Sequence, residues 1–180
     1  MRELALHVLD IATNSVKANA SLVTVEITAK DNLLTISIKD NGKGMSEEFV
    51  ARVTDPFTTT RTTRKVGMGL PLLKQAAETS GGTFDIKSKL GVGTEVTVTF
   101  RLDDIDRVPL GDIAETATTL LYPDMDFVWI YTVEDRSYTF DTREIKEALD
   151  GVPIDSPEII AFLNSMLKEN IESINGGLVL

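Results

Sequence analysis

Four short segments, each polar or rich in glycine, follow one another within residues 10–94 and constrain this chain more than any other feature. Each segment alone is ordinary, because a polar pair on a helix is usually solvated, Asn-Gly usually forms a turn, and a lone Gly-x-Gly is a weak signal. Together, in this order, they indicate one binding site assembled from several elements. The segments are Asp10-x3-Asn14-x2-Lys17, Asp40-Asn-Gly-Lys-Gly-Met45, Gly67-Met-Gly-Leu70 and Gly91-Val-Gly-Thr94.

The first two segments fall on elements that hydrophobic periodicity predicts. Apolar residues at helical spacing predict a helix over residues 3–18, and the Asp/Asn pair, four residues apart, lies on one face of it. Alternating apolar residues predict strands over 23–27 and 34–38. Asp40 continues the apolar parity of the second strand, so we expect its carboxylate to point towards the buried side where that strand ends.

The rest of the chain has an α+β pattern without an internal repeat. Pro71 is expected at the first position of a helix that ends at Gly81 and Gly82. The further elements predicted are helices over 46–53, 71–79, 112–121, 142–151 and 156–174, and strands over 84–86, 96–102, 127–133 and 138–140.

The net charge of −10 is unevenly distributed along the chain. Residues 1–105 hold 13 basic and 13 acidic residues, whereas residues 106–180 hold 5 basic and 15 acidic residues. An acidic surface repels nucleic-acid phosphates and anionic lipid, so we expect neither nucleic acid nor a membrane as a partner. The step in charge predicts two regions, a domain over 1–105 and an acidic extension of unknown role over 106–180. The acidic residues of the extension are either solvated or face a basic protein partner.

Composition narrows the chemistry further. The chain has no cysteine and a single histidine, His7, which excludes disulfides, thiolate nucleophiles and multi-histidine metal sites. Any metal is therefore expected to be a hard ion held by oxygen ligands. No apolar run reaches the length of about 18 residues that spans a membrane, and residue 3 is acidic where a secretory signal would be basic. These features favour a cytoplasmic protein.

The four segments together resemble the GHKL superfamily of ATP-binding domains, which includes DNA gyrase, the heat-shock chaperone ATPase, MutL and the histidine kinases. The resemblance covers residues 3–102 and is strongest to the histidine-kinase catalytic domain, through Asp55-Pro-Phe-Thr-Thr-Thr-Arg61 and Gly67-Met-Gly-Leu-Pro-Leu-Leu-Lys74. It implies an α+β fold of the Bergerat type, a two-layer α/β sandwich with helices on one face of a mixed sheet. The small α+β extension over 106–180 would follow it.

The resemblance implies an adenine site around Asp40. This residue matches the family's adenine aspartate, whose carboxylate accepts a hydrogen bond from the exocyclic amine and so selects against GTP. Gly42 and Gly44 are expected to let the backbone approach the base, with Met45 beside them. Thr94, which shares the inward parity, matches the family's supporting hydroxyl.

The resemblance also implies a phosphate site. Asn14 matches the family's metal ligand and would hold Mg²⁺ against the phosphates of ATP, while Lys17 adds a positive charge. Residues 58–66 correspond to the family's mobile lid, which is rich in cations and flanked by hinge glycines. The further nucleotide contacts expected in or beside the lid are Phe57, Thr59, Thr60, Arg61, Lys65, Gly67, Met68, Gly69 and Leu70.

Asp10 decides whether the site does chemistry. The family's hydrolases and serine kinases have a glutamate general base at this position, and its histidine kinases commonly have asparagine. Asp10 could orient a hydroxyl or a water, or it could hold a magnesium-bound water. His7 lies inside the nucleotide helix and is interpreted as a packing residue, so the phosphate acceptor would be another protein, a serine or threonine, or water.

Three functions follow from these expectations. The first is a Mg²⁺- and ATP-dependent protein kinase that acts in trans on a partner. The second is a slow ATPase, and the third is a non-enzymatic module whose interactions ATP controls. The assembly is left open, with a homodimer as one alternative.

Overall fold

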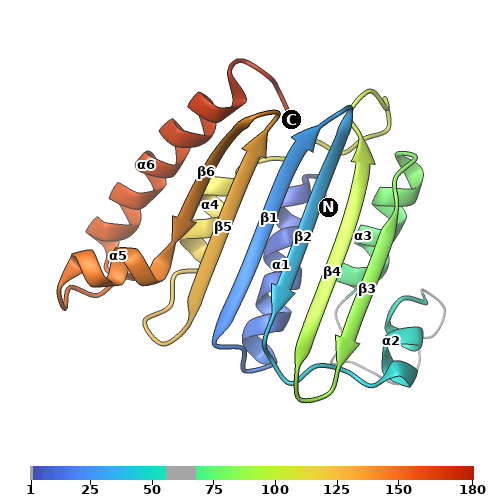
Figure 1. Ribbon diagram of the computed structural model, residues 1–180, viewed down its shortest axis with the longest axis horizontal. Helices are drawn as coiled ribbons and strands as arrows, with labels where there is room; N and C mark the ends of the chain where they lie inside the picture. The colour runs from blue at the N-terminus through green and yellow to red at the C-terminus, as the bar shows by residue number, and fades with distance from the viewer. Residues whose placement is uncertain (1, 56–67) are drawn as a thin grey trace.

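The computed structural model describes residues 2–55 and 68–180. Its centre is one six-stranded mixed sheet in the order β3-β4-β2-β1-β5-β6 (Figure 1). Only the β1–β5 pairing is parallel, and the other four pairings are antiparallel. The strands are β1 (Leu22–Lys30), β2 (Leu33–Asp40), β3 (Phe84–Lys89), β4 (Gly93–Arg101), β5 (Asp126–Val133) and β6 (Arg136–Asp141).

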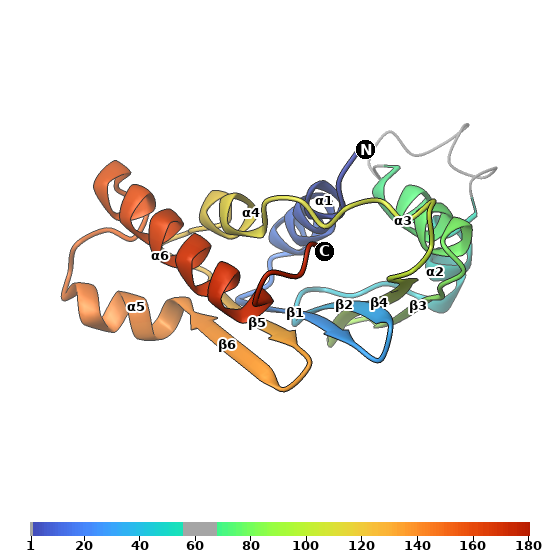
Figure 2. The same ribbon diagram turned by 90° about the horizontal axis from the view of Figure 1, so that it is seen from above.

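The helices lie mainly on one side of this sheet. Figure 2 shows α1, α3, α4 and α6 in a layer above the strands, with α5 beside the end of β6. The buried side chains between the two layers form the core. On the opposite face of β1, β2 and β4, Figure 2 shows no helix formed by the described residues. The helices are α1 (Leu4–Lys17), α2 (Glu47–Val53), α3 (Gly69–Thr79), α4 (Ile113–Thr119), α5 (Thr142–Leu149) and α6 (Pro157–Asn175). The predicted α+β sandwich, with helices on one face of a mixed sheet, is confirmed.

Helices α2 and α4 each begin at a side-chain cap. Ser46 caps α2 through a hydrogen bond from Phe49 N to its Oγ (3.2 Å). Asp112 caps α4 in the same way, with Glu115 N as the donor (2.8 Å). Both side chains satisfy an amide that the first turn of a helix leaves unpaired.

The start of α3 differs from the prediction. The helix begins at Gly69 and has Met68 as its N-cap, so Pro71 is its third residue and not its first. The first intrahelical bond runs from Leu72 N to Met68 O (3.1 Å). A proline is accommodated anywhere in the first turn, since no amide there has an intrahelical acceptor.

The C-terminal segment extends the same sheet. Strand β5 pairs with β1 over eight residue pairs, from Leu22↔Asp126 to Ala29↔Val133. The start of α1 is bound by the same segment, because Leu4 N donates to Pro109 O (2.9 Å) and Ala5 N to Leu110 O (2.8 Å). The 106–180 region therefore contacts both the strand and the helix that support the candidate site.

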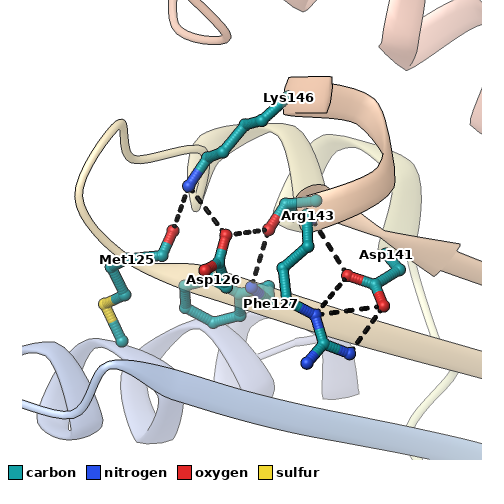
Figure 3. Close-up of polar contacts among 7 residues, drawn as sticks. Met125, Asp126, Phe127, Asp141, Arg143 and Lys146 are labelled. Atoms are coloured by element: carbon teal, nitrogen blue, oxygen red, sulfur yellow. Dashed lines mark hydrogen bonds and ion pairs between the residues drawn. The ribbon is translucent and has the colours of Figure 1, made fainter. Parts of the chain in front are cut away.

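A polar junction fixes α5 against β5 (Figure 3). Asp126 Oδ1 accepts hydrogen bonds from Lys146 Nζ (2.8 Å) and from Thr142 Oγ1 (3.1 Å). Beside it, Asp141 caps α5 and forms a two-pronged ion pair with Arg143. The Arg143 guanidinium holds the pKa of the Asp141 carboxyl below its usual value. These charges stabilise the fold, since their partners are other residues of the same chain.

Candidate functional site

A cavity of about 390 Å³ opens beside α1 at the end of β2, in the size range of small-molecule sites. Seven of the residues predicted to bind nucleotide line it: Asn14, Lys17, Asp40, Gly44, Met45, Leu70 and Thr94. The remaining lining residues are mostly apolar: Ile11, Ser15, Ala18, Ile38, Lys43, Phe49, Val53 and Val96. An apolar slot with one carboxylate in its wall suits a flat ring that has a polar edge.

Asp40 is held by three donors from three directions. Ser15 Oγ donates to Oδ2 (2.6 Å), and the amides of Gly42 (2.9 Å) and Thr94 (3.3 Å) donate to Oδ1. Ser15 itself is buried. Because all three neighbours donate, they fix the orientation of the carboxylate. The predicted inward direction of Asp40 is thus borne out by the geometry.

Two glycines near Asp40 are required by the backbone of the fold itself. Gly44 has a φ of +67°, and a Cβ there would overlap the carbonyl of Lys89. Gly93 has a φ of +142°, and a Cβ there would overlap the carbonyl of Asp40. Glycine at these two positions therefore allows the loop after β2 and the β3–β4 turn to pack closely on each other, whether or not a ligand is bound.

Ser88 links these two loops on the cavity side of β3. Its Oγ accepts a hydrogen bond from Met45 N (2.8 Å) and donates to Gly93 O (3.0 Å). It also lies 2.8 Å from Thr94 Oγ1, its cross-strand neighbour. Ser88 thus contacts two residues of the predicted adenine site, Met45 and Thr94.

The phosphate end of the site is formed by α1 and the first turn of α3. Asn14 and Lys17 line the cavity from α1, one turn apart. Asp10 lies one turn earlier and packs on Gly69, where a Cβ would overlap Asp10 Oδ2. The predicted base therefore lies at the N-terminus of α3, where unpaired amides favour negative charge.

Not every predicted residue lines the cavity. Asp10, Gly42, Met68 and Gly69 lie outside its lining, and Met68 is 58% exposed as the N-cap of α3. The other predictions in or beside the lid fall on residues that the structure does not describe: Phe57, Thr59, Thr60, Arg61, Lys65 and Gly67.

His7 is almost fully buried on α1, in keeping with the interpretation as a packing residue. Its Nδ1 is buried and has no hydrogen-bond partner among the described residues. Burial lowers the pKa of the imidazole, and the nearby Asp10 carboxylate opposes this only in part. A buried neutral imidazole is poorly placed to accept a phosphoryl group from outside.

Sequence reasoning missed two residues that organise the site, Ser15 and Ser88. Ser15 follows Asn14 directly, and its position on the buried face of α1 was the available signal. Ser88 continues the inward parity of Phe84 and Ile86, as Asp40 does on β2. In both cases the hydroxyl supports a neighbouring recognition residue.

The donor set fits magnesium carried by a nucleotide. Among the described residues there is no group of three acidic or histidine side chains that could hold a metal. The Asn14 carboxamide lines the cavity, and an Mg²⁺ ion takes one or two protein oxygens and completes its shell with phosphates and waters. Asn14 is the residue that would hold such an ion.

The fold and the cavity define a nucleotide-binding α/β sandwich, and comparison with known proteins gives the family. Residues 2–104 match the model of the histidine kinase-, DNA gyrase B-, and HSP90-like ATPases. This chain belongs to that family and carries its ATP-binding domain.

Sensor kinases are among the relatives. Sporulation kinase D of Bacillus subtilis is 32% identical over 94 residues, which are 51% of this chain and 18% of that protein. The heme sensor protein HssS of Staphylococcus saprophyticus is 34% identical over 95 residues, 51% of this chain and 21% of that protein. Sensor histidine kinase YvrG of B. subtilis is 29% identical over 94 residues, which are 49% of this chain and 16% of that protein. The match thus spans about a fifth or less of these relatives' own length.

Solved structures agree on the fold. The Aquifex aeolicus MutL ATPase domain complexed with ADP superposes with a TM-score of 0.53 at 21% identity, covering 83% of this chain and 70% of that one. The N-terminal domain of a DNA repair protein gives a TM-score of 0.51 at 12% identity, and the superposition covers 78% of this chain and 52% of that one. Among the described residues, no helix has both the length and the apolar character needed to cross a membrane.

Proposed function

We propose that this protein binds ATP with Mg²⁺ and transfers the γ-phosphoryl group to a hydroxyl of a separate protein. The adenine ring occupies the cavity with its amino group on Asp40. The phosphates extend towards Asn14, Lys17 and the first turn of α3. The kinase names of several relatives support the transfer to protein.

The observation that carries the proposal is the position of Asp10. This carboxylate lies on the same helix as Asn14, one turn away, and packs on the first residue of α3. A base there adjoins both the residue that would hold Mg²⁺ and the amides that would face the phosphates. Bound magnesium would neutralise charge on the phosphates.

The proposed step is a direct displacement. The acceptor oxygen forms a bond to the γ-phosphorus while the bond between that phosphorus and the β–γ bridging oxygen breaks, so that ADP leaves. Asp10 takes the proton of the acceptor hydroxyl. Lys17 offsets charge on the phosphate oxygens. Asp40 binds the amino group of adenine and so holds the nucleotide in position.

The test is incubation of the protein with γ-labelled ATP, Mg²⁺ and protein fractions of its source cells. We expect label on a protein other than this chain, and loss of that label with Asp10→Asn while ATP binding stays intact. Free phosphate without labelled protein would identify the slow ATPase. Intact binding with neither product would leave the ATP-controlled interaction module, and unchanged transfer by Asp10→Asn would remove the base.

A further inference from the structure

Ser88 bridges the loop after β2 and the β3–β4 turn, the two loops of the adenine site. It is half-buried on the cavity side of β3 and is paired with Thr94 of β4. Thr94 is in turn the register partner of Asp40 on β2. Three neighbouring strands therefore place Ser88, Thr94 and Asp40 in one row on the same face of the sheet, and Thr94 and Asp40 line the cavity.

The hydrogen count around Ser88 restricts what Thr94 can do. The Ser88 hydroxyl has one hydrogen and two lone pairs. Met45 N–H uses one lone pair (2.8 Å), and the Gly93 carbonyl, which can only accept, takes the hydrogen (3.0 Å). The 2.8 Å contact between Ser88 Oγ and Thr94 Oγ1 then needs the hydrogen of Thr94.

We propose that Ser88 is a positioning residue that sets nucleotide specificity by orienting the Thr94 hydroxyl. The hydrogen of Thr94 points to Ser88, so Thr94 presents only lone pairs to the cavity. This inference rests on the proposed function, since it concerns how the same site recognises the base of ATP.

As a consequence, Asp40 and Thr94 both present hydrogen-bond acceptors to the base, and neither presents a donor. Asp40 presents carboxylate lone pairs, because its own neighbours are all donors, and Thr94 presents hydroxyl lone pairs beside it. Two acceptors match the 6-amino group of adenine, which has two hydrogens. They oppose the 6-carbonyl of hypoxanthine or guanine, where acceptor would face acceptor.

Calorimetric titration with ATP and with inosine triphosphate, both with Mg²⁺, tests this inference. The two nucleotides differ only at position 6 and in the N1 proton that accompanies it. Wild-type protein should prefer ATP. Ser88→Ala frees the Thr94 hydroxyl to rotate and donate, so the ratio of the two affinities should fall by about tenfold, the worth of one hydrogen bond.

The ratio separates positioning from simple support of the loops. If Ser88 only supports Met45 and Gly93, Ser88→Ala weakens both nucleotides equally and leaves the ratio unchanged, which overturns the inference. Thr94→Val should lower the ratio by itself, and Ser88→Ala added to it should lower the ratio no further. The measurement on Thr94→Val alone does not depend on how well the Ser88→Ala chain folds.

Two controls complete the design. Ser88→Thr keeps the hydroxyl and should keep the wild-type ratio. Ser37→Ala makes the same change on the uncovered face of β2 and should alter neither affinity. Wild-type protein that binds neither nucleotide would refute the proposed function as well, whereas wild-type preference for ATP with an unchanged ratio in Ser88→Ala refutes this inference alone.

Discussion

The lysines that line the cavity differ from the basic residues of the 106–180 region in what they contact. Every basic residue of 106–180 contacts a carboxylate or a backbone carbonyl of the chain: Arg107, Arg136, Arg143, Lys146 and Lys168. In the domain that matches the ATPase family, Lys17 and Lys43 line the cavity and form no ion pair with any residue that the structure describes. The basic residues of 106–180 are thus all used within the fold, whereas two lysines at the cavity remain available to a ligand.

This difference predicts that substitutions separate into two classes. Changes at the cavity should impair binding and leave the stability of the fold almost unaltered. Changes at the α5 junction should lower stability and leave nucleotide affinity unaltered.

Asn14→Ala should abolish Mg²⁺-dependent ATP binding. Its carboxamide is the oxygen that would hold the ion, and we expect a loss of more than about 100-fold in affinity, beyond what removal of a supporting residue costs. Titration with ATP in the presence and absence of Mg²⁺ measures it. The midpoint of thermal unfolding should stay unchanged, and tight binding by the variant would remove Asn14 from the site.

Gly69→Ala should destabilise the protein even though alanine is the better helix former. The new methyl group would overlap the Asp10 carboxylate, at a cost of about 1–3 kcal/mol. Denaturant unfolding measures the cost. The double variant Asp10→Ala/Gly69→Ala should recover it, because the obstructing carboxylate is gone. Equal destabilisation with and without Asp10 would show that Gly69 serves the backbone and not Asp10.

Lys146→Met should lower the free energy of unfolding by about 1–2 kcal/mol and leave ATP affinity unchanged. The substitution leaves the partly buried Asp126 carboxylate without its cation and Met125 O without its donor. Lys168→Met is the matched control, because its ion pair with Asp112 is more exposed and should contribute less than about 1 kcal/mol. Equal losses at the two sites would contradict the role given to this junction.

His7 should make stability fall as the pH falls below neutral. Burial depresses the pKa of the folded imidazole below its usual 6.5, so the unfolded chain takes up a proton first. The stability contribution is complete above pH 6.5 and is lost as the pH falls from there towards the folded pKa. His7 is the single histidine, so His7→Leu should flatten this part of the profile. An equal slope in the variant would assign the titration elsewhere.

The direction of Asp40 and the position of Asn14 were accessible from sequence because each follows from a local period. A two-residue period along β2 turns Asp40 inward, and a helical turn brings Asn14 to the cavity. The start of α3 was placed two residues late, since Pro71 fits the first turn at more than one position.

The long-range features were not accessible in this way. Nothing local in Val23 or Val25 indicates that their strand pairs in parallel with Phe127 and Trp129, about a hundred residues away. The excess of acidic residues after residue 106 changes the charge of the surface. It gives no information on strand order, because strand order depends on apolar residues in the core. Ser15 and Ser88 were missed because periodicity gives the direction of a serine side chain but not the partner of its hydroxyl, and both partners come from distant segments.

Amide chemical-shift mapping during titration with ATP and Mg²⁺ tests the central claim most directly. The account predicts saturable shifts at Ser15, Gly42, Leu70 and Thr94, around the cavity, with much smaller shifts along β6 and α5. Absence of saturable shifts around the cavity, or shifts concentrated on β6 and α5, would contradict the claim that ATP binds at the cavity and not at the 106–180 region.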